Sequence, residues 1–146
     1  MTTSVFNETD AFRTGLSIRK TWLGEEHVER SLKAAEANPF TVPMQQIATE
    51  SVWGQLWSRP GLELKERSLI TLAILGALHM EEELQLHTGA ALRNGLTEEQ
   101  ISEVLLHVAL YAGVPRGIAA FRAARAVVEA GGAGSEASKA DPAGGS

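Results

Sequence analysis

The sequence predicts an all-α fold. Apolar residues recur at three- and four-residue spacing along most of the chain, and no segment shows the strict alternation of a strand. Thr-Glu-Glu-Gln at residues 97–100 has the pattern of a capping box, which opens a helix. Proline or glycine separates the periodic segments. We therefore expect a bundle of about six or seven helices.

The breaks in periodicity place these helices along the chain. Thr9 suits the N-cap of the first helix, Asn38-Pro39 stops the second, and Pro43 is tolerated in the first turn of the third. Arg59-Pro60-Gly61 is a turn, and Gly95 fits the left-handed position after a helix end. The expected helices cover residues 9–24, 25–37, 41–57, 63–80, 81–94, 97–112 and 116–130.

Two of these helices carry unusually large apolar surfaces. Trp53 and Trp57 lie four residues apart, and aromatic surface of this kind more often serves a core or a subunit contact than a ligand. From Leu69 to Leu78 the chain is apolar on every side, so this helix is expected to be buried centrally or between subunits. Because one small bundle does not hide so much apolar surface, we expect an oligomer.

Length and composition favour a single domain. The chain has 146 residues, 44% of them hydrophobic, which is enough for one core. We expect a flexible arm at residues 1–8, the domain at residues 9–130, and a disordered tail rich in glycine, alanine and serine at residues 131–146.

Charge and cysteine content exclude several classes of function. The net charge is −5 and no basic run is present, so nucleic-acid binding is not expected. The absence of cysteine removes disulfides, thiolate nucleophiles and zinc–thiolate sites. No apolar run is long enough to span a membrane and the start lacks a signal-peptide pattern, so a soluble, cytoplasmic protein is expected.

Glu83 and His87 are the strongest candidates for chemistry. At i, i+4 on a helix they project from one face, close enough for the carboxylate to hydrogen-bond the imidazole. On spacing alone, a solvated acidic turn with a surface histidine explains them at least as well.

A second row at this spacing contains Glu103, His107 and Tyr111. His107 sits within an apolar stretch, where a buried ring needs a partner. It is therefore either a core histidine satisfied by a backbone carbonyl or by Tyr111, or part of a pocket.

Three stretches carry a resemblance to a known family. They are WGQLWSRPGLELKERSLITLAIL at residues 53–75, EEELQLHTGAALRNGLTEEQISEVLLHVALYAGVP at residues 81–115, and AFRAA at residues 120–124. With the region around Leu23-Gly24 the resemblance covers roughly residues 15–128, and the chain resembles the cysteine-free branch of the carboxymuconolactone decarboxylase family. It implies an alkylhydroperoxidase D-like all-α bundle and a cofactor-free enzyme of protocatechuate and aromatic catabolism. It also implies a homohexamer built as a trimer of dimers.

The resemblance implies a reaction and a site. The expected reaction converts 4-carboxymuconolactone to 3-oxoadipate enol-lactone and carbon dioxide, without metal or other cofactor. His87 is expected to protonate carbon after decarboxylation while Glu83 orients and charges the imidazole, although Glu83 itself as the acid stays open. Cations for the substrate carboxylates are sought among Arg67, Arg93 and Arg116, with Arg93 the weakest candidate. The remaining expected substrate-binding residues are Trp53, His107 and Tyr111.

The chain departs from the family pattern in ways that keep other functions open. Close decarboxylases usually carry arginines where this chain has Gln85 and Gly89, and the segment at residues 115–118 is also altered. A different lactone or unsaturated acid is therefore the main alternative, and a non-catalytic helical oligomer is a further one. Aligning the sister thiol-peroxidase branch puts its two cysteines at Met80 and Glu83, so peroxidase activity is excluded.

Overall fold

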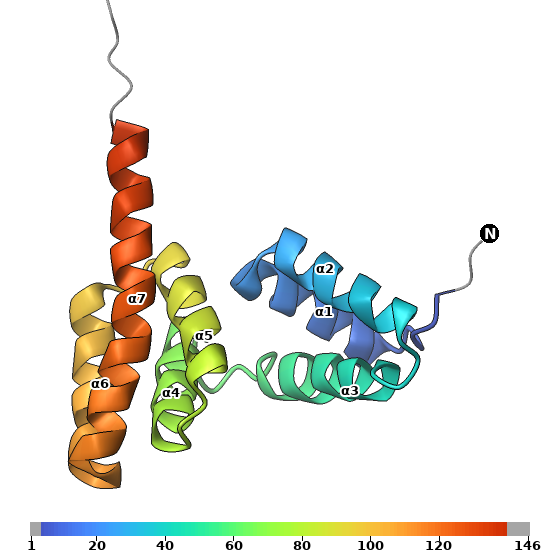
Figure 1. Ribbon diagram of the computed structural model, residues 1–146. Coiled ribbons are helices and arrows are strands. Elements are labelled where there is room, and N and C mark those ends of the chain that lie inside the picture. Colours follow the sequence, from blue (N-terminus) through green and yellow to red (C-terminus); the bar gives the residue numbers. More distant parts are fainter. Residues whose placement is uncertain (1–3, 140–146) are drawn as a thin grey trace, which may run out of the picture. The chain divides into compact units, whose positions relative to one another are not determined.

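The computed structural model describes residues 4–139, with side chains as far as residue 131, and this part of the chain contains helices and no strand (Figure 1). The all-α prediction is confirmed. The helices are α1 (Asp10–Leu23), α2 (Glu25–Ala37), α3 (Val42–Ile47), the π-helix η1 (Ala48–Leu56), α4 (Leu64–Ala77), α5 (Glu81–Arg93), α6 (Glu98–Ala112) and α7 (Val114–Lys139).

The described chain divides into two compact units, whereas the sequence favours one domain over residues 9–130. The first unit ends at Arg67 and the second begins at Ser68, within the first turn of α4. In the described residues, no helix combines the length and the apolar character that a membrane span requires.

The first unit is organised by a close crossing of α1 and η1. Gly15 and Gly54 lie at the crossing, and a Cβ on either one would collide with a backbone carbonyl oxygen of the other helix, that of Thr49 for Gly15 and that of Ala11 for Gly54. Only glycine allows the two backbones to approach so closely. As expected, Thr9 caps α1, because its hydroxyl accepts a hydrogen bond from Phe12 N at 3.1 Å.

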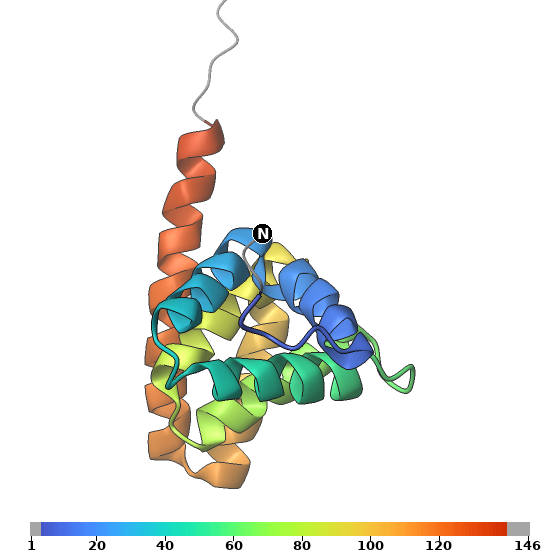
Figure 2. The same cartoon turned by 90° about the vertical axis from the view of Figure 1, so that its right-hand side faces the viewer.

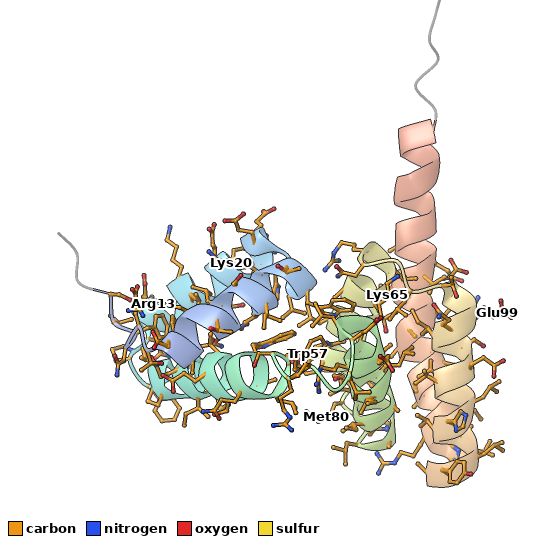
Figure 3. The ribbon with its side chains drawn as sticks, turned by 180° about the vertical axis from the view of Figure 1, so that it is seen from behind. Arg13, Lys20, Trp57, Lys65, Met80 and Glu99 are labelled. Carbon is orange, nitrogen blue, oxygen red and sulfur yellow. The ribbon has the colours of Figure 1, made fainter. Side chains whose placement is uncertain are left out.

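The third expected helix is not a single α-helix. After the six residues of α3 the backbone widens into η1, where Trp57 N bonds to Val52 O five residues earlier, at 2.9 Å. Trp53 and Trp57 are both buried, and their ring centroids are 4.5 Å apart. Trp57, labelled in Figure 3 at the C-terminal end of η1, also packs against Trp22 of α1 at 5.7 Å. The tryptophans therefore join η1 to α1.

The described part of the expected N-terminal arm is anchored rather than loose. Phe6 is 6% exposed and stacks on Phe12 with centroids 5.5 Å apart. Asn7 N donates to Gln46 Oε1 at 2.9 Å, and Gln46 Nε2 donates back to Asn7 O at 2.8 Å. Burial of an aromatic ring and two reciprocal hydrogen bonds hold residues 4–8 against the unit. Residues 1–3 lie outside the described chain.

The second unit has its helices in up-and-down order (Figures 1 and 2). A Cβ on Gly76 of α4 would meet Val108 of α6 at 3.2 Å and Ala120 of α7 at 3.4 Å, so these three helices meet closely at this level. Gln85 Nε2 of α5 donates to Ala123 O of α7 at 3.2 Å, and Gly89 lies beside Val127 one turn further on, so α5 and α7 run parallel. The α4–α5 turn and the α6–α7 turn therefore lie at one end of the unit.

Helix ends in the second unit follow the predicted signals with three adjustments. The capping box is confirmed, because Thr97 Oγ1 accepts from Gln100 N and Gln100 Oε1 accepts from Thr97 N. α4 ends at Ala77 instead of Met80, since His79 takes a left-handed conformation with φ 60°. α7 begins at Val114, directly after Gly113 with φ 113°, because a proline is tolerated in its first turn. It continues to Lys139 into the expected tail, whose last residues lie outside the described chain.

The apolar helix predicted from residues 69–78 is only partly covered within one chain. Leu72 is fully buried, whereas Ile70, Ile74 and Leu78 are 48%, 51% and 65% exposed. Central burial is thus wrong for this row of side chains, and the alternative, contact with another subunit, stays a prediction.

Candidate functional site

His87 lies in the middle of α5 and is 9% exposed. Glu83, one turn earlier on the same face, is exposed to solvent. Leu84 and Thr88, which precede and follow His87 in the sequence, are both buried. Thr88 Oγ1 donates to Leu84 O at 2.7 Å, so this hydroxyl is satisfied by the backbone of its own helix. The helix therefore presents an imidazole inside the protein and a carboxylate at the surface.

A different face of α5 holds Gln85 and Gly89, the two positions at which the resemblance leads us to expect arginine. Gln85 bonds to the α7 backbone and Gly89 faces Val127 of the same helix. Residues two apart on a helix differ in direction by about 200°, so Gln85 points away from the direction of His87. Within one chain, Gln85 and Gly89 therefore belong to the α5–α7 contact and not to the face that carries His87.

Arg67 and Ser68 form a buried polar pair of neighbours at the start of α4. Arg67 is 8% exposed, and its Nη2 donates to Arg59 O at 2.8 Å, across the turn that precedes the helix. Ser68 is fully buried, and its hydroxyl has no hydrogen-bond partner among the described residues. A buried polar atom of this kind is unusual in native proteins, which makes Ser68 a site candidate that the residue pattern alone does not identify.

Two further polar or aromatic candidates belong to the first unit. Trp53 is 5% exposed and packs against Trp57 with the rings tilted, as a core residue would, and its expected substrate-binding role stays a prediction. Arg19, which the sequence reasoning missed, is 7% exposed, and its Nη1 donates to Gln45 Oε1 at 2.9 Å and to Thr49 Oγ1 at 3.1 Å. The feature of the sequence that indicates burial of Arg19 is its position between Ile18 and Trp22 on an amphipathic helix.

His107 and Tyr111 lie on the solvent side of α6, so the first alternative for His107, a core histidine, is wrong, and the pocket alternative stays a prediction. Their rings stack with centroids 5.9 Å apart and an interplanar angle of 7°, and Tyr111 is 88% exposed. The buried face of this helix consists of Ile101, Leu105 and Val108. Because successive residues of a helix differ in direction by about 100°, residue 107 points about 100° away from residue 108 and about 200° away from residue 105. Arg116, in the first turn of α7, is exposed as well.

The topology gathers several predicted residues at one end of the second unit without joining them in a pocket. Glu83 in the first turn of α5, Tyr111 at the end of α6 and Arg116 at the start of α7 all belong to the end where the two turns lie. Figure 3 labels Met80 at this end and Glu99 at the other. All three side chains are exposed in one chain.

Grooves open on either side of α6 in the second unit. A groove of about 380 Å³ between α4 and α6 includes His107 in its wall. A groove of about 350 Å³ between α6 and α7 contains none of the predicted site residues. At its edge, the Arg125 guanidinium donates to Glu129 at 2.7 Å, and this bond raises the pKa of Arg125. Among the residues that the structure describes, no three histidine or acidic side chains are arranged to hold a metal ion.

Comparison with known proteins identifies the family of the chain, which the geometry alone does not. The model of the carboxymuconolactone decarboxylase family matches residues 43–126, which include α4, α5, α6 and both Glu83 and His87. The chain belongs to this family. It is 42% identical over 121 residues to 4-carboxymuconolactone decarboxylase of Acinetobacter baylyi, covering 83% of this chain and 89% of the relative. It is 47% identical over 104 residues to nitrosuccinic acid decarboxylase of Metarhizium robertsii, covering 71% of each protein. Like these relatives, the chain is an enzyme of the carboxy-lyase class.

Proposed function

We propose that this carboxy-lyase converts 4-carboxymuconolactone to 3-oxoadipate enol-lactone and carbon dioxide without a cofactor. The observation that carries the proposal is the similarity to the Acinetobacter enzyme over most of both chains. The enclosed His87 with Glu83 one turn earlier supports it, because the reaction needs a proton donor in a site from which bulk water is largely excluded.

The chemistry explains why few catalytic groups suffice. The carboxylate that leaves is vinylogous to the lactone carbonyl, so the electrons of the breaking carbon–carbon bond pass through the double bond to the carbonyl oxygen. Carbon dioxide departs and a dienolate remains. The protein then has to stabilise the oxyanion and to deliver one proton to carbon.

His87 is the proposed proton donor and Glu83 the group that orients it. A carboxylic acid that donates a proton near neutral pH is usually kept protonated by apolar surroundings. Few carboxyl groups at a protein surface have such surroundings. The exposed position of Glu83 therefore favours the supporting role over the alternative in which Glu83 is the acid.

Arg67 and Arg116 are the proposed partners of the substrate carboxylates. Arg67 is buried, and a guanidinium in such a place binds carboxylate more strongly than one in water. Arg116 is exposed, as are His107 and Tyr111. These three side chains line an enclosed site only where another copy of the chain covers them, so the proposal includes a homo-oligomer, with the hexamer of the family as the expected form.

A second candidate substrate is nitrosuccinic acid, and the 47% identity to the Metarhizium enzyme favours it. Its nitro group neighbours a carboxyl group, so the electrons released by loss of carbon dioxide enter the nitro group and form a nitronate. That intermediate also needs one proton on carbon. The two reactions therefore make the same demand on His87 and differ in the size and shape of the electron acceptor.

The test is to give the purified protein each acid separately and to follow carbon dioxide release and product formation. We expect His87→Ala to lower kcat by about 100-fold or more and Glu83→Gln to lower it too, with the fold retained. Glu82→Gln is the matched control, because Glu82 is also exposed and lies on another face of α5. Turnover of neither acid would refute both substrates, and full activity of His87→Ala would refute the assignment of the proton donor.

A further inference from the structure

The solvent side of α6 forms an exposed surface that we call the α6 outer face. It consists of Glu103, Leu106, His107, Leu110 and Tyr111, all of them exposed. Leu106 is 44% exposed, Leu110 80% and Tyr111 88%. Large apolar side chains in a contiguous row on a helix indicate an interaction site.

We propose that two copies of the chain pair through the α6 outer face, and that Tyr111 of each copy enters the α4–α6 groove of the other. The proposal deepens the homo-oligomer proposed above by locating one of its contacts. It assigns His107 and Tyr111 to that contact.

The order of residues on this face is self-complementary. In an antiparallel pair related by a two-fold axis near residues 107 and 108, Leu106 of each copy faces Leu110 of the other, because these positions are symmetric about residue 108. Glu103 and Tyr111 are symmetric about residue 107, and positions 107 and 108 are only about 1.5 Å apart along the helix axis. The same axis thus places a carboxylate, which accepts hydrogen bonds, beside a phenol hydroxyl that donates one.

The neighbouring groove offers a place for the tyrosine ring. Its volume is about 380 Å³, and Leu69 and Val104 provide its apolar lining. Glu103 and His107 also line this groove. Because the two-fold axis places Tyr111 of the second copy beside Glu103, that tyrosine lies at the groove. The ring, almost fully exposed in one chain, gains an apolar cover and its hydroxyl gains an acceptor.

The absence of cysteine from the sequence allows a direct test of this contact. A single His107→Cys substitution lies close to the proposed axis, so a short bismaleimide should join two copies rapidly through this position. Lys33→Cys, exposed on α2, is the control and should join them slowly. Equal rates, or no linked dimer from His107→Cys, would overturn the proposal.

Sedimentation equilibrium of substituted proteins provides an independent measurement. Leu110→Glu buries a charge in the proposed contact and should weaken the pairing roughly 100-fold, whereas Lys33→Glu should not change it. Tyr111→Phe removes only the hydroxyl and should weaken it by about threefold to tenfold. Because Leu110 is 80% exposed, its substitution should leave the helix content unchanged, which circular dichroism checks.

The results separate this contact from the wider proposal. A wild-type protein that sediments as a monomer would refute both the homo-oligomer and the contact. An oligomer that Leu110→Glu leaves intact would refute the contact alone. Neither measurement uses a substrate, so the outcome does not depend on which acid the enzyme decarboxylates.

Discussion

Replacing Gly54 by alanine tests the close crossing that organises the first unit. The added Cβ would collide with Ala11 O, and would lie 3.0 Å from Ala11 C and 3.3 Å from Thr49 O. Ala11 belongs to α1, and its backbone atoms cannot move aside as a side chain can, so α1 and η1 must separate.

The expected size of the effect follows from two opposing contributions. Overpacking costs about 1–3 kcal/mol of unfolding free energy, and alanine in a helix recovers up to about 1 kcal/mol relative to glycine. A net loss of about 1–2 kcal/mol lowers the Tm of a chain of this length by roughly 2–8 °C.

Thermal unfolding followed by circular dichroism provides the measurement. Gly61→Ala is the control, because nothing lies within 4 Å of the position a Cβ would take there. That substitution should leave the Tm unchanged or raise it, through the lower entropy of the unfolded chain. If Gly54→Ala and Gly61→Ala melt at the same temperature, the close approach of α1 and η1 is refuted.

Three further predictions concern the N-terminal segment, a helix cap and the α5–α7 contact. Phe6→Ala should lower the Tm because a buried ring is lost, while Val5→Ala, at a side chain 51% exposed, should not, and calorimetry distinguishes them. Thr97→Ala removes a cap and should cost about 1 kcal/mol in chemical denaturation, with Thr97→Ser close to wild type. Gln85→Arg should leave KM for a dicarboxylate substrate unchanged, because the side chain faces α7 and not the face of His87; a lower KM in steady-state kinetics would show that an arginine here reaches the substrate.

Local signals in the sequence account for most of the helix boundaries. Thr9, the Thr97–Gln100 box and Gly113 act through their own backbone and immediate neighbours, so they operate without knowledge of the rest of the fold. The all-α class and the position of Glu83 and His87 on one helix follow from the same short-range rules. The resemblance of several ordered segments pointed to the family that the comparison then established.

Burial was less predictable because it depends on which segments meet. His107 lies within a run of apolar residues, yet the face of α6 that packs inward is made by Ile101, Leu105 and Val108. Arg19 and Ser68 look like ordinary polar residues in the sequence and are almost fully buried.

What the sequence by itself determined is the class, the order and most of the ends of the helices, together with the pair on α5 that carries the proposed chemistry. The tertiary structure decided which side of each helix is covered, that Gln85 and Gly89 face α7, and that η1 is a π-helix that crosses α1 closely at Gly15 and Gly54. The physical reason is range: caps and turns act over about four residues, whereas burial and close backbone contact arise between segments far apart in the chain.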